Sequence, residues 1–389
     1  MRTDGIAPGP ACASGGDILT EKKDVFRIAP TGRLVCGEAG ALLAALATPG
    51  QPFRLGGTGA LVAGAGEFET LTSGSTGRPR HIRRSMASWI RSFEVNAGLF
   101  GVGPGVAGAV LGGMEQSLAL YGAIEALYLG AGLMALGGMR PDRQRAALAR
   151  AEVNYASPAQ LRLLVEAPGP VLAGLRLVLC GGAALDEGLR GALREAAPGA
   201  DLRAFYGAAE TSFVSLAGPD DPTQSVGQAY PGVEIEIRGA AGEVWVRSPY
   251  LFIGYGAGDP GPARWQEGWL SVGEIGALDA RGRLRLFGRA GRMVTVADQN
   301  VFPEAIETFL LGLPGVRRAA VLPRRDARRG VHLVAFVQGD PAQEAAVMAA
   351  LRRELGPLKA PKALIWRLDW PMLGSGKTDL EALAREVPG

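Results

Sequence analysis

The alternation of apolar runs with helical periodicity between residues 109 and 196 is the feature that most constrains the fold of this chain. Apolar runs typical of buried strands occupy residues 109–113, 133–136 and 175–180, and helical periodicity follows the first and the last of them. Strands that alternate with helices in this way form a largely parallel sheet. The sequence therefore predicts an α/β fold, with a large N-terminal domain of layered sheets and helices.

The pattern changes twice after this region. Residues 227–287 hold short segments in which apolar and polar residues alternate, which predicts a β-barrel-like subdomain of antiparallel strands. Helices and strands then mix, which predicts an α+β region. Its expected helices cover 303–311 and 343–355, and its expected strands cover 319–322, 333–337 and 364–368.

We expect two domains from these patterns. Residues 1–289 are predicted to form a large N-terminal domain, in which residues 1–20 are a flexible leader. Residues 290–389 are predicted to form a small C-terminal domain. Within the larger domain, residues 81–100 have helical periodicity and are predicted to form a helix.

Composition narrows the classes of function. A net charge of +3 gives no strong case for nucleic acid or membrane lipid as a partner. The three cysteines are far apart and only two histidines are present, which disfavours a zinc site or a histidine-dependent triad. The first residues lack the basic start and apolar run of a signal peptide. We therefore expect a cytoplasmic protein.

A loop of glycine and hydroxyl residues, TSGSTGRPR, follows an apolar strand end and indicates phosphate binding. Glycine lets the backbone turn its N–H groups toward an anion, and the hydroxyl groups add donors. For this loop taken alone, a polar surface turn is the alternative. The residues predicted to hold nucleotide phosphates are Thr72, Ser73, Gly74, Ser75, Thr76 and Gly77.

A second glycine-rich segment, GSGKT at 374–378, looks like the end of a Walker A loop. That motif requires glycine at the position where this chain has Pro371. No strong strand leads directly into the segment either, so we reject the Walker interpretation.

Four motifs occur in a fixed order along the chain: TSGSTGRPR at 72–80, YGAAE at 206–210, GWLSVGEIGALDARGRLRLFGRAGR at 268–292 and GSGK at 374–377. In this order they resemble the acyl-adenylate-forming (AMP-binding) superfamily, which includes acyl-CoA ligases, peptide-synthetase adenylation domains and firefly-type luciferases. The resemblance is of the acyl- or aryl-CoA ligase type, with a shortened N-terminal part. It implies ATP, Mg²⁺ and CoA as cofactors. It also implies that residues 1–289 form the nucleotide- and acid-binding domain and that residues 290–389 form a mobile lid domain.

The resemblance also implies roles for individual residues. Its implied catalytic residues are Lys377, Glu210 and Arg80, and Glu210 is expected to bind Mg²⁺, which prefers hard oxygen ligands. Lys377 is expected to neutralise charge on the acid's oxygen and on the α-phosphate. The other residues implied to contact the nucleotide are Gly181, Gly182, Ala183, Tyr206, Gly207, Glu274 and Arg289.

Several positions depart from the family's pattern. Arg80 replaces the usual loop lysine, Ala209 replaces the threonine before Glu210, and Glu274 replaces an aspartate. Gly291 stands at the hinge position, where the absence of a Cβ allows large backbone rotations. Asp298 replaces a glycine that lets the pantetheine arm of CoA pass.

The resemblance places the acid pocket beside residues with small side chains, which favours a flat aryl or hydroxycinnamate-like acid. Its expected pocket residues are Met114, Glu115, Tyr155, Phe205 and Ala208. Glu115 has three possible interpretations: a carboxylate for a substrate ammonium, an acceptor for a phenol, or a partly exposed glutamate at a helix start.

The function implied is activation of a carboxylic acid with ATP to an acyl-adenylate, followed by transfer of the acyl group to CoA. A basic cluster, Arg324, Arg325, Arg328 and Arg329, is either a contact for CoA phosphates or a solvated turn. One alternative is adenylation of an amino or amine-bearing acid for a carrier protein. The other is a catalytically silent nucleotide-binding protein. Expected partners are the acid, ATP and CoA, with neither nucleic acid nor a membrane.

Overall fold

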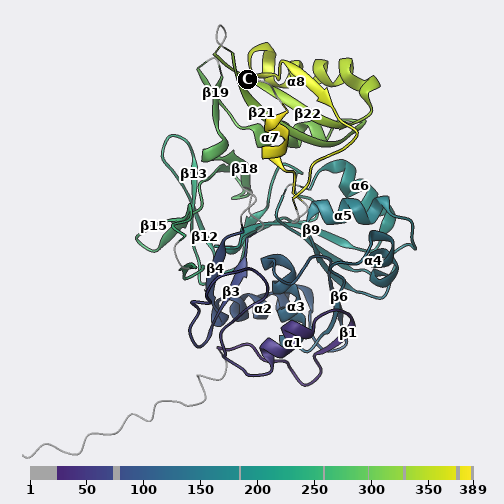
Figure 1. The fold of residues 1–389 in the computed structure, drawn as a ribbon, viewed down its shortest axis with the longest axis vertical. Helices are drawn as coiled ribbons and strands as arrows, with labels where there is room; N and C mark the ends of the chain where they lie inside the picture. The colour runs from purple at the N-terminus through teal and green to yellow at the C-terminus, as the bar shows by residue number, and fades with distance from the viewer. Residues whose placement is uncertain are drawn as a thin grey trace, which may run out of the picture.

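The computed structural model describes residues 24–72, 79–183, 185–256, 259–296, 298–326, 330–373 and 377–386. Figure 1 shows the C-terminal elements from α7 (Pro303–Leu311) onward gathered at one end of a larger N-terminal part. The expected leader, residues 1–20, lies outside the described residues. No helix in the described ranges is both long and apolar enough to cross a membrane.

The centre of the larger part is an eight-stranded sheet. In spatial order its first six strands are parallel, the seventh pairs antiparallel with the sixth, and the eighth pairs antiparallel with the seventh. Its inner strands are largely buried on both faces, which explains the continuous apolar runs at residues 133–136 and 175–180. The predicted parallel sheet is therefore confirmed. In spatial order the strands are β1 (Arg33–Gly37), β6 (Gly132–Ala135), β5 (Ala107–Val110), β7 (Val153–Ala156), β8 (Leu177–Cys180), β9 (Asp201–Ala208), β10 (Ser212–Leu216) and β11 (Gln228–Ala229).

Helices lie on both faces of this sheet, and each face has its own hydrophobic core. Successive residues of a strand point to opposite faces, so in β7 Tyr155 joins one core and Ala156 joins the other. The first core also contains α1 (Gly40–Leu46), α2 (Met86–Phe100) and α3 (Ser117–Tyr128). The second contains α4 (Pro141–Leu148), α5 (Pro158–Glu166) and α6 (Glu187–Ala196).

A second sheet of four strands corrects the helix predicted over residues 81–100. Residues 81–85 form strand β4, and the helix α2 begins only at Met86, where the side chain of Ser85 accepts a hydrogen bond from the Ser88 N–H. The strand forms because it pairs with its neighbour β3 in antiparallel register. In spatial order the strands are β14 (Gly254–Tyr255), β4 (His81–Ser85), β3 (Glu67–Leu71) and β2 (Phe53–Arg54).

A six-stranded antiparallel sheet follows, where alternating residues predicted short β segments. Its strand β12 alternates between exposed and half-buried residues, whereas the inner strand β13 has three consecutive buried residues. The alternation in the sequence therefore reports one covered face at β12, while β13 is covered on both faces. Its strands are β12 (Glu234–Arg238), β13 (Glu243–Arg247), β15 (Arg264–Gln266), β16 (Trp269–Ser271), β17 (Glu274–Leu278) and β18 (Leu284–Arg289).

The C-terminal part has its own core around a long hairpin, β21 (Val316–Asp326) and β22 (Gly330–Gly339), joined by β23 (Ala363–Trp366). Both hairpin strands are longer than predicted, because their pairing extends beyond the apolar residues that gave the signal. The other elements are the hairpin β19 (Val294–Val296) and β20 (Gln299–Val301), and the helices α8 (Glu344–Lys359) and α9 (Leu380–Arg385). The predicted boundary at 289/290 falls at a short 3₁₀ turn, Ala290–Arg292.

Candidate active site

The predicted phosphate loop connects the adjacent ends of β3 and β4. Thr72 N–H donates to the Arg80 carbonyl at 2.9 Å, and Arg80 N–H donates to Thr72 Oγ1 at 3.0 Å. These two bonds close the loop at its base. The residues expected to hold phosphates, Ser73, Gly74, Ser75, Thr76 and Gly77, lie outside the described residues.

Arg80 follows the loop, and its side chain is about one third exposed. Its Nε lies 3.3 Å from Asp259 Oδ2. A partly exposed ion pair of this kind contributes little to stability, because water screens the two charges and fixing the two side chains costs entropy. The guanidinium can therefore exchange this carboxylate for another anion at small cost.

The end of β8 closely approaches an aromatic ring. A Cβ built on Gly181 would lie 2.2 Å from Phe205 Cζ, so only glycine fits beneath this ring. Phe205 in turn packs on Phe213, with ring centroids 4.3 Å apart. Gly182 and Ala183 follow on the exposed surface, and Gly182 has a φ of 92°. The predicted contacts of Gly181 and Phe205 thus lie at one place.

The YGAAE motif forms the tight connection between β9 and β10. Gly207 is required there, because a Cβ would lie 2.1 Å from the Ser212 carbonyl oxygen. Thr211 Oγ1 accepts a hydrogen bond from the Ala208 N–H at 2.9 Å. Thr211 therefore braces the turn, and its hydroxyl donates to the Ser212 carbonyl at 3.2 Å. Tyr206 is buried, and burial raises its pKa well above the ordinary value, with Glu274 adding to the effect.

Glu210 is only 7% exposed, although its carboxylate has no contacting cation among the described residues. Tyr255 Oη donates to Glu210 Oε1 at 3.0 Å, and the Glu210 carbonyl accepts the Phe252 N–H at 2.8 Å. Glu210 also raises the pKa of the Tyr255 hydroxyl, second to burial. Tyr255 was not predicted from the sequence, because it reaches the motif only through the pairing of β14 with β4.

Glu274 and Arg289 lie opposite each other on the paired strands β17 and β18. Arg289 Nε donates to Glu274 Oε1 at 2.9 Å, and Glu274 is 8% exposed. The arginine thus holds the carboxylate in one orientation at the edge of the six-stranded sheet.

Lys377 comes from the far end of the sequence to the same place. Burial lowers the pKa of its ammonium, and the nearby Arg289 lowers it further. The carboxylates of Glu274 and Glu210 act in the opposite direction, so both lie within electrostatic reach. The Leu373 N–H donates to the Lys377 carbonyl at 2.8 Å, which holds the backbone of the lysine against Leu373.

The residues predicted for the acid pocket fall into two groups. Glu115 is exposed and adjoins the phosphate loop, since its carbonyl accepts the Leu71 N–H at 3.1 Å. Met114 and Ala208 are half-buried. Tyr155 instead lies in the core of the large domain, where its hydroxyl donates to Glu125 at 2.6 Å. This hydrogen bond already occupies the hydroxyl of Tyr155.

The donor set fits a magnesium ion bound together with a nucleotide. The described residues hold no group of three or more histidine, cysteine or acidic side chains that would bind a metal by themselves. Mg²⁺ commonly binds through one or two carboxylates plus substrate phosphates and water. Glu210 offers one hard oxygen, Oε2, with no hydrogen-bond partner in the described part of the chain.

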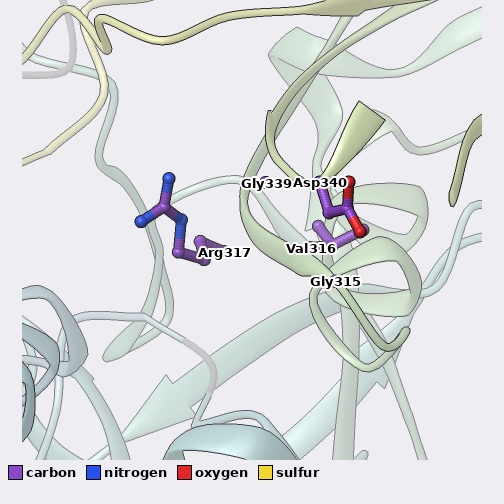
Figure 2. Close-up of a pocket in the computed structure, with 5 residues that line it drawn as sticks. All are labelled: Gly315, Val316, Arg317, Gly339 and Asp340. Atoms are coloured by element: carbon purple, nitrogen blue, oxygen red, sulfur yellow. The ribbon is translucent and has the colours of Figure 1, made fainter. Parts of the chain in front are cut away.

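A separate hollow of about 360 Å³ lies in the small domain (Figure 2). Figure 2 shows the Arg317 side chain pointing away from the Asp340 carboxylate. None of the predicted site residues lines this hollow, which is formed by Gly315, Val316, Arg317, Gly339 and Asp340.

Two family models match the chain. The model of the AMP-binding enzyme matches residues 70–256, and the model of the AMP-binding enzyme C-terminal domain matches residues 305–377. The chain therefore belongs to the AMP-binding enzyme family, the acyl-adenylate-forming superfamily that its motifs resemble.

Relatives are found among acyl-CoA ligases. The uncharacterized acyl–CoA ligase YhfT of Bacillus subtilis is 31% identical over 321 residues, which cover 79% of this chain and 66% of that protein. The 2-succinylbenzoate–CoA ligase of Lactococcus lactis is 32% identical over 224 residues, which cover 55% of this chain and 47% of that protein. The chain thus spans 66% of the length of the first relative and 47% of the length of the second.

Solved structures agree with the fold. The amide bond synthetase McbA from Marinactinospora thermotolerans is 28% identical with a TM-score of 0.71, covering 82% of this chain and 69% of that one. ATP-bound MatB from Rhodopseudomonas palustris is 24% identical with the same TM-score of 0.71, covering 82% of this chain and 67% of that one. This second likeness is evidence for the fold only. The expected α/β class with a small C-terminal α+β domain is confirmed.

Proposed function

We propose that the chain is an AMP-forming ligase that activates a carboxylic acid with ATP and transfers the acyl group to CoA. In the first step an oxygen of the acid attacks the α-phosphorus of ATP, the bond to the β-phosphate breaks, and pyrophosphate leaves. In the second step the thiol of CoA attacks the acyl carbon, loses its proton to solvent, and AMP leaves. The observation that carries the proposal is the convergence of Lys377 with Glu274 and Glu210, although these residues are far apart in the sequence.

Lys377 is the residue that we expect to act on the first step. Negative charge accumulates on the acid's oxygen and on the α-phosphate as the two approach, and a buried ammonium stabilises such charge more than an exposed one. Two nearby carboxylates counteract the effect of burial on its pKa, which helps to keep the ammonium charged.

Glu210 is proposed to bind the magnesium ion, which would neutralise phosphate charge when bound. Its hydrogen bond from Tyr255 leaves the second carboxylate oxygen for the ion. Arg80 is proposed to assist at the phosphates, where its forked guanidinium can bind two oxygens.

Tyr206, Glu274 and Arg289 are proposed to bind the nucleoside. The Tyr206 ring would stack on the adenine, with Gly181, Gly182, Ala183 and Gly207 on the backbone around it. Glu274 would accept hydrogen bonds from the ribose hydroxyls. Its pairing with Arg289 supports this role, because the arginine orients a carboxylate that is one methylene longer than the family's aspartate.

The acid is proposed to be an aryl or similarly flat one. The packing of Phe205 over Gly181 supports this, because an aromatic wall favours a flat ring by stacking. The indoleacetate–CoA ligase of Aromatoleum aromaticum, 29% identical over 241 residues, is named for such an acid. Met114, Glu115 and Ala208 remain predicted pocket residues, and Tyr155 would act only from beneath the surface.

CoA is the proposed acceptor, with the small domain turning about Gly291 between the two steps. Gly291 lies in the 3₁₀ turn between β18 and β19. Asp298 takes a φ of 60° in the turn between β19 and β20, a backbone conformation that suits the family's glycine. Of the basic cluster, Arg324 and Arg325 lie on β21, while Arg328 and Arg329 lie outside the described residues.

A carrier protein is the second candidate acceptor, with an amine-bearing acid held by Glu115. The exposure of Glu115 beside the phosphate loop supports its availability to a substrate. The fatty acid–[acyl-carrier-protein] ligase ScoC of Streptomyces coeruleorubidus, 31% identical over 209 residues, is named for that kind of acceptor.

A panel of carboxylic acids tests the proposal, with pyrophosphate release measured with and without CoA. We expect release to require one class of acid and to increase when CoA is added. Release with amine-bearing acids only, lost in Glu115→Gln, would favour the carrier-protein candidate. Binding of ATP without release for any acid would favour the catalytically silent alternative.

A further inference from the structure

Arg84 is a fully buried cation whose role the motifs do not explain. It lies in β4, and its side chain is 0% exposed. β4 buries alternate residues, so Arg84 points into the core on the same side as Ile82. Burying a guanidinium is costly unless its donors are used, so its retention in the core indicates a specific set of acceptors.

The acceptors are two backbone carbonyls from different segments. Nη1 of Arg84 donates to the Ala209 carbonyl, and Nη2 donates to the Tyr250 carbonyl. Beneath them the guanidinium lies 5.7 Å from the centroid of the Trp89 ring. In the described part of the chain the charge is therefore met by dipoles and an aromatic face, rather than by a contacting carboxylate.

Both carbonyls belong to the surroundings of Glu210. The Ala209 carbonyl is part of the peptide bond that joins Ala209 to Glu210. Tyr250 precedes Phe252, whose N–H donates to the Glu210 carbonyl at 2.8 Å. Arg84 thus fixes the backbone directly before Glu210 through the Ala209 carbonyl. Through the Tyr250 carbonyl it also fixes the segment whose Phe252 N–H binds the Glu210 carbonyl.

The same arginine connects these segments to the phosphate loop. β4 starts at His81, directly after the loop closes at Arg80. Burial lowers the pKa of Arg84 to about 9, and the strongest opposing influence is the carboxylate of Glu210. The two side chains therefore lie within electrostatic reach of each other.

We propose that Arg84 is a positioning residue that holds the Glu210 carboxylate in place relative to the phosphate loop. It acts through Glu210 and contacts neither nucleotide nor acid. The inference rests on the proposed function, in which Glu210 binds the magnesium ion of ATP. A residue with this role should alter the dependence of the reaction on Mg²⁺ more than its rate at saturating Mg²⁺.

The test compares Arg84→Met and Arg84→Lys with the unaltered chain in acid-dependent ATP–pyrophosphate exchange over a range of Mg²⁺ concentrations. Arg145→Met is the matched control, because Arg145 also donates to carbonyls, those of Val165, Ala167 and Pro170, but on the α4–α5 side of the sheet. We expect Arg84→Met to raise the half-saturating Mg²⁺ concentration at least about tenfold, as two charge-assisted bonds are lost. Arg84→Lys should give a smaller increase, and Arg145→Met none.

An equal loss of rate at every Mg²⁺ concentration would overturn the inference, as would a failure of both Arg84 variants to fold, since either result assigns Arg84 a purely structural role. Calorimetric binding of ATP, with Mg²⁺ and with EDTA, separates this inference from the proposed function. If no acid supports exchange in the unaltered chain, the proposed function fails. The inference then still requires Arg84→Met to weaken ATP binding with Mg²⁺ but not with EDTA.

Discussion

Replacing Glu125 with glutamine should remove a pH dependence from the stability of the large domain. Glu125 lies in α3 and is 1% exposed. Asn96 Nδ2 donates to its Oε1 at 2.8 Å, and the Tyr155 hydroxyl donates to its Oε2 at 2.6 Å. Burial raises the pKa of this carboxyl from its usual 4.5 to about 7, and the hydrogen bonds only partly oppose the shift.

The direction of the effect follows from which state holds the proton. Between pH 4.5 and 7 the unfolded chain loses the Glu125 proton while the folded chain keeps it. Stability therefore falls as pH rises through this window and levels off above it. One pKa unit corresponds to about 1.4 kcal/mol, so the whole shift amounts to about 3 kcal/mol.

Urea unfolding at pH 5 and at pH 8 measures this contribution. Glutamine stays neutral at both values, so Glu125→Gln should gain most of this shift, about 2.5 kcal/mol, relative to the unaltered chain on going from pH 5 to pH 8. The exposed Glu94 in α2 provides the control. Glu94→Gln should change the free energy of unfolding by the same amount at pH 5 and at pH 8. Parallel pH profiles for Glu125→Gln and the unaltered chain would refute the reasoning.

Three further predictions follow from single contacts. Gly181→Ala should abolish pyrophosphate exchange, because its Cβ would overlap the Phe205 ring, and adding Phe205→Ala should restore part of the rate; no restoration would contradict the packing argument. Tyr255→Phe should raise the half-saturating Mg²⁺ concentration severalfold, since one hydrogen bond to Glu210, about 1 kcal/mol, is lost; an unchanged Mg²⁺ titration would argue against this contact. Ser85→Ala should lower the free energy of unfolding by about 1 kcal/mol through loss of the α2 cap, and an unchanged urea midpoint would exclude the cap.

The fold was predictable where one pattern decides the structure. The buried parallel strands β6 and β8 carry apolar runs that only a sheet covered on both faces would require. The strand β7 was not predicted, because the polar Asn154 interrupts its apolar residues. Residues 81–85 were assigned to a helix because they directly precede the helix α2. They form a strand because they pair with Glu67–Leu71, a segment distant in the sequence. Ile82 is the only apolar residue of this stretch, so its sequence shows no alternation that would indicate a strand.

The site was predictable where a residue belongs to a motif. Glu210, Glu274 and Lys377 were selected in this way, and the structure brings them within electrostatic reach of one another. Tyr255 and Arg84 could not be selected, because each acts by reaching another segment: Tyr255 through its hydroxyl, Arg84 through two carbonyls. No spacing in the sequence encodes such contacts.

The most direct test of the central claim measures both half-reactions of Lys377→Ala, with Lys362→Ala as the control. Lys362 is an exposed lysine of the same small domain, whose Nζ donates to the Pro357 carbonyl. Removal of one preorganised charge typically costs about 10²–10³ in rate. Lys377→Ala should lose that much in adenylate formation and still make thioester from supplied adenylate and CoA. Equal loss in both half-reactions, or no loss in the first, would contradict the account.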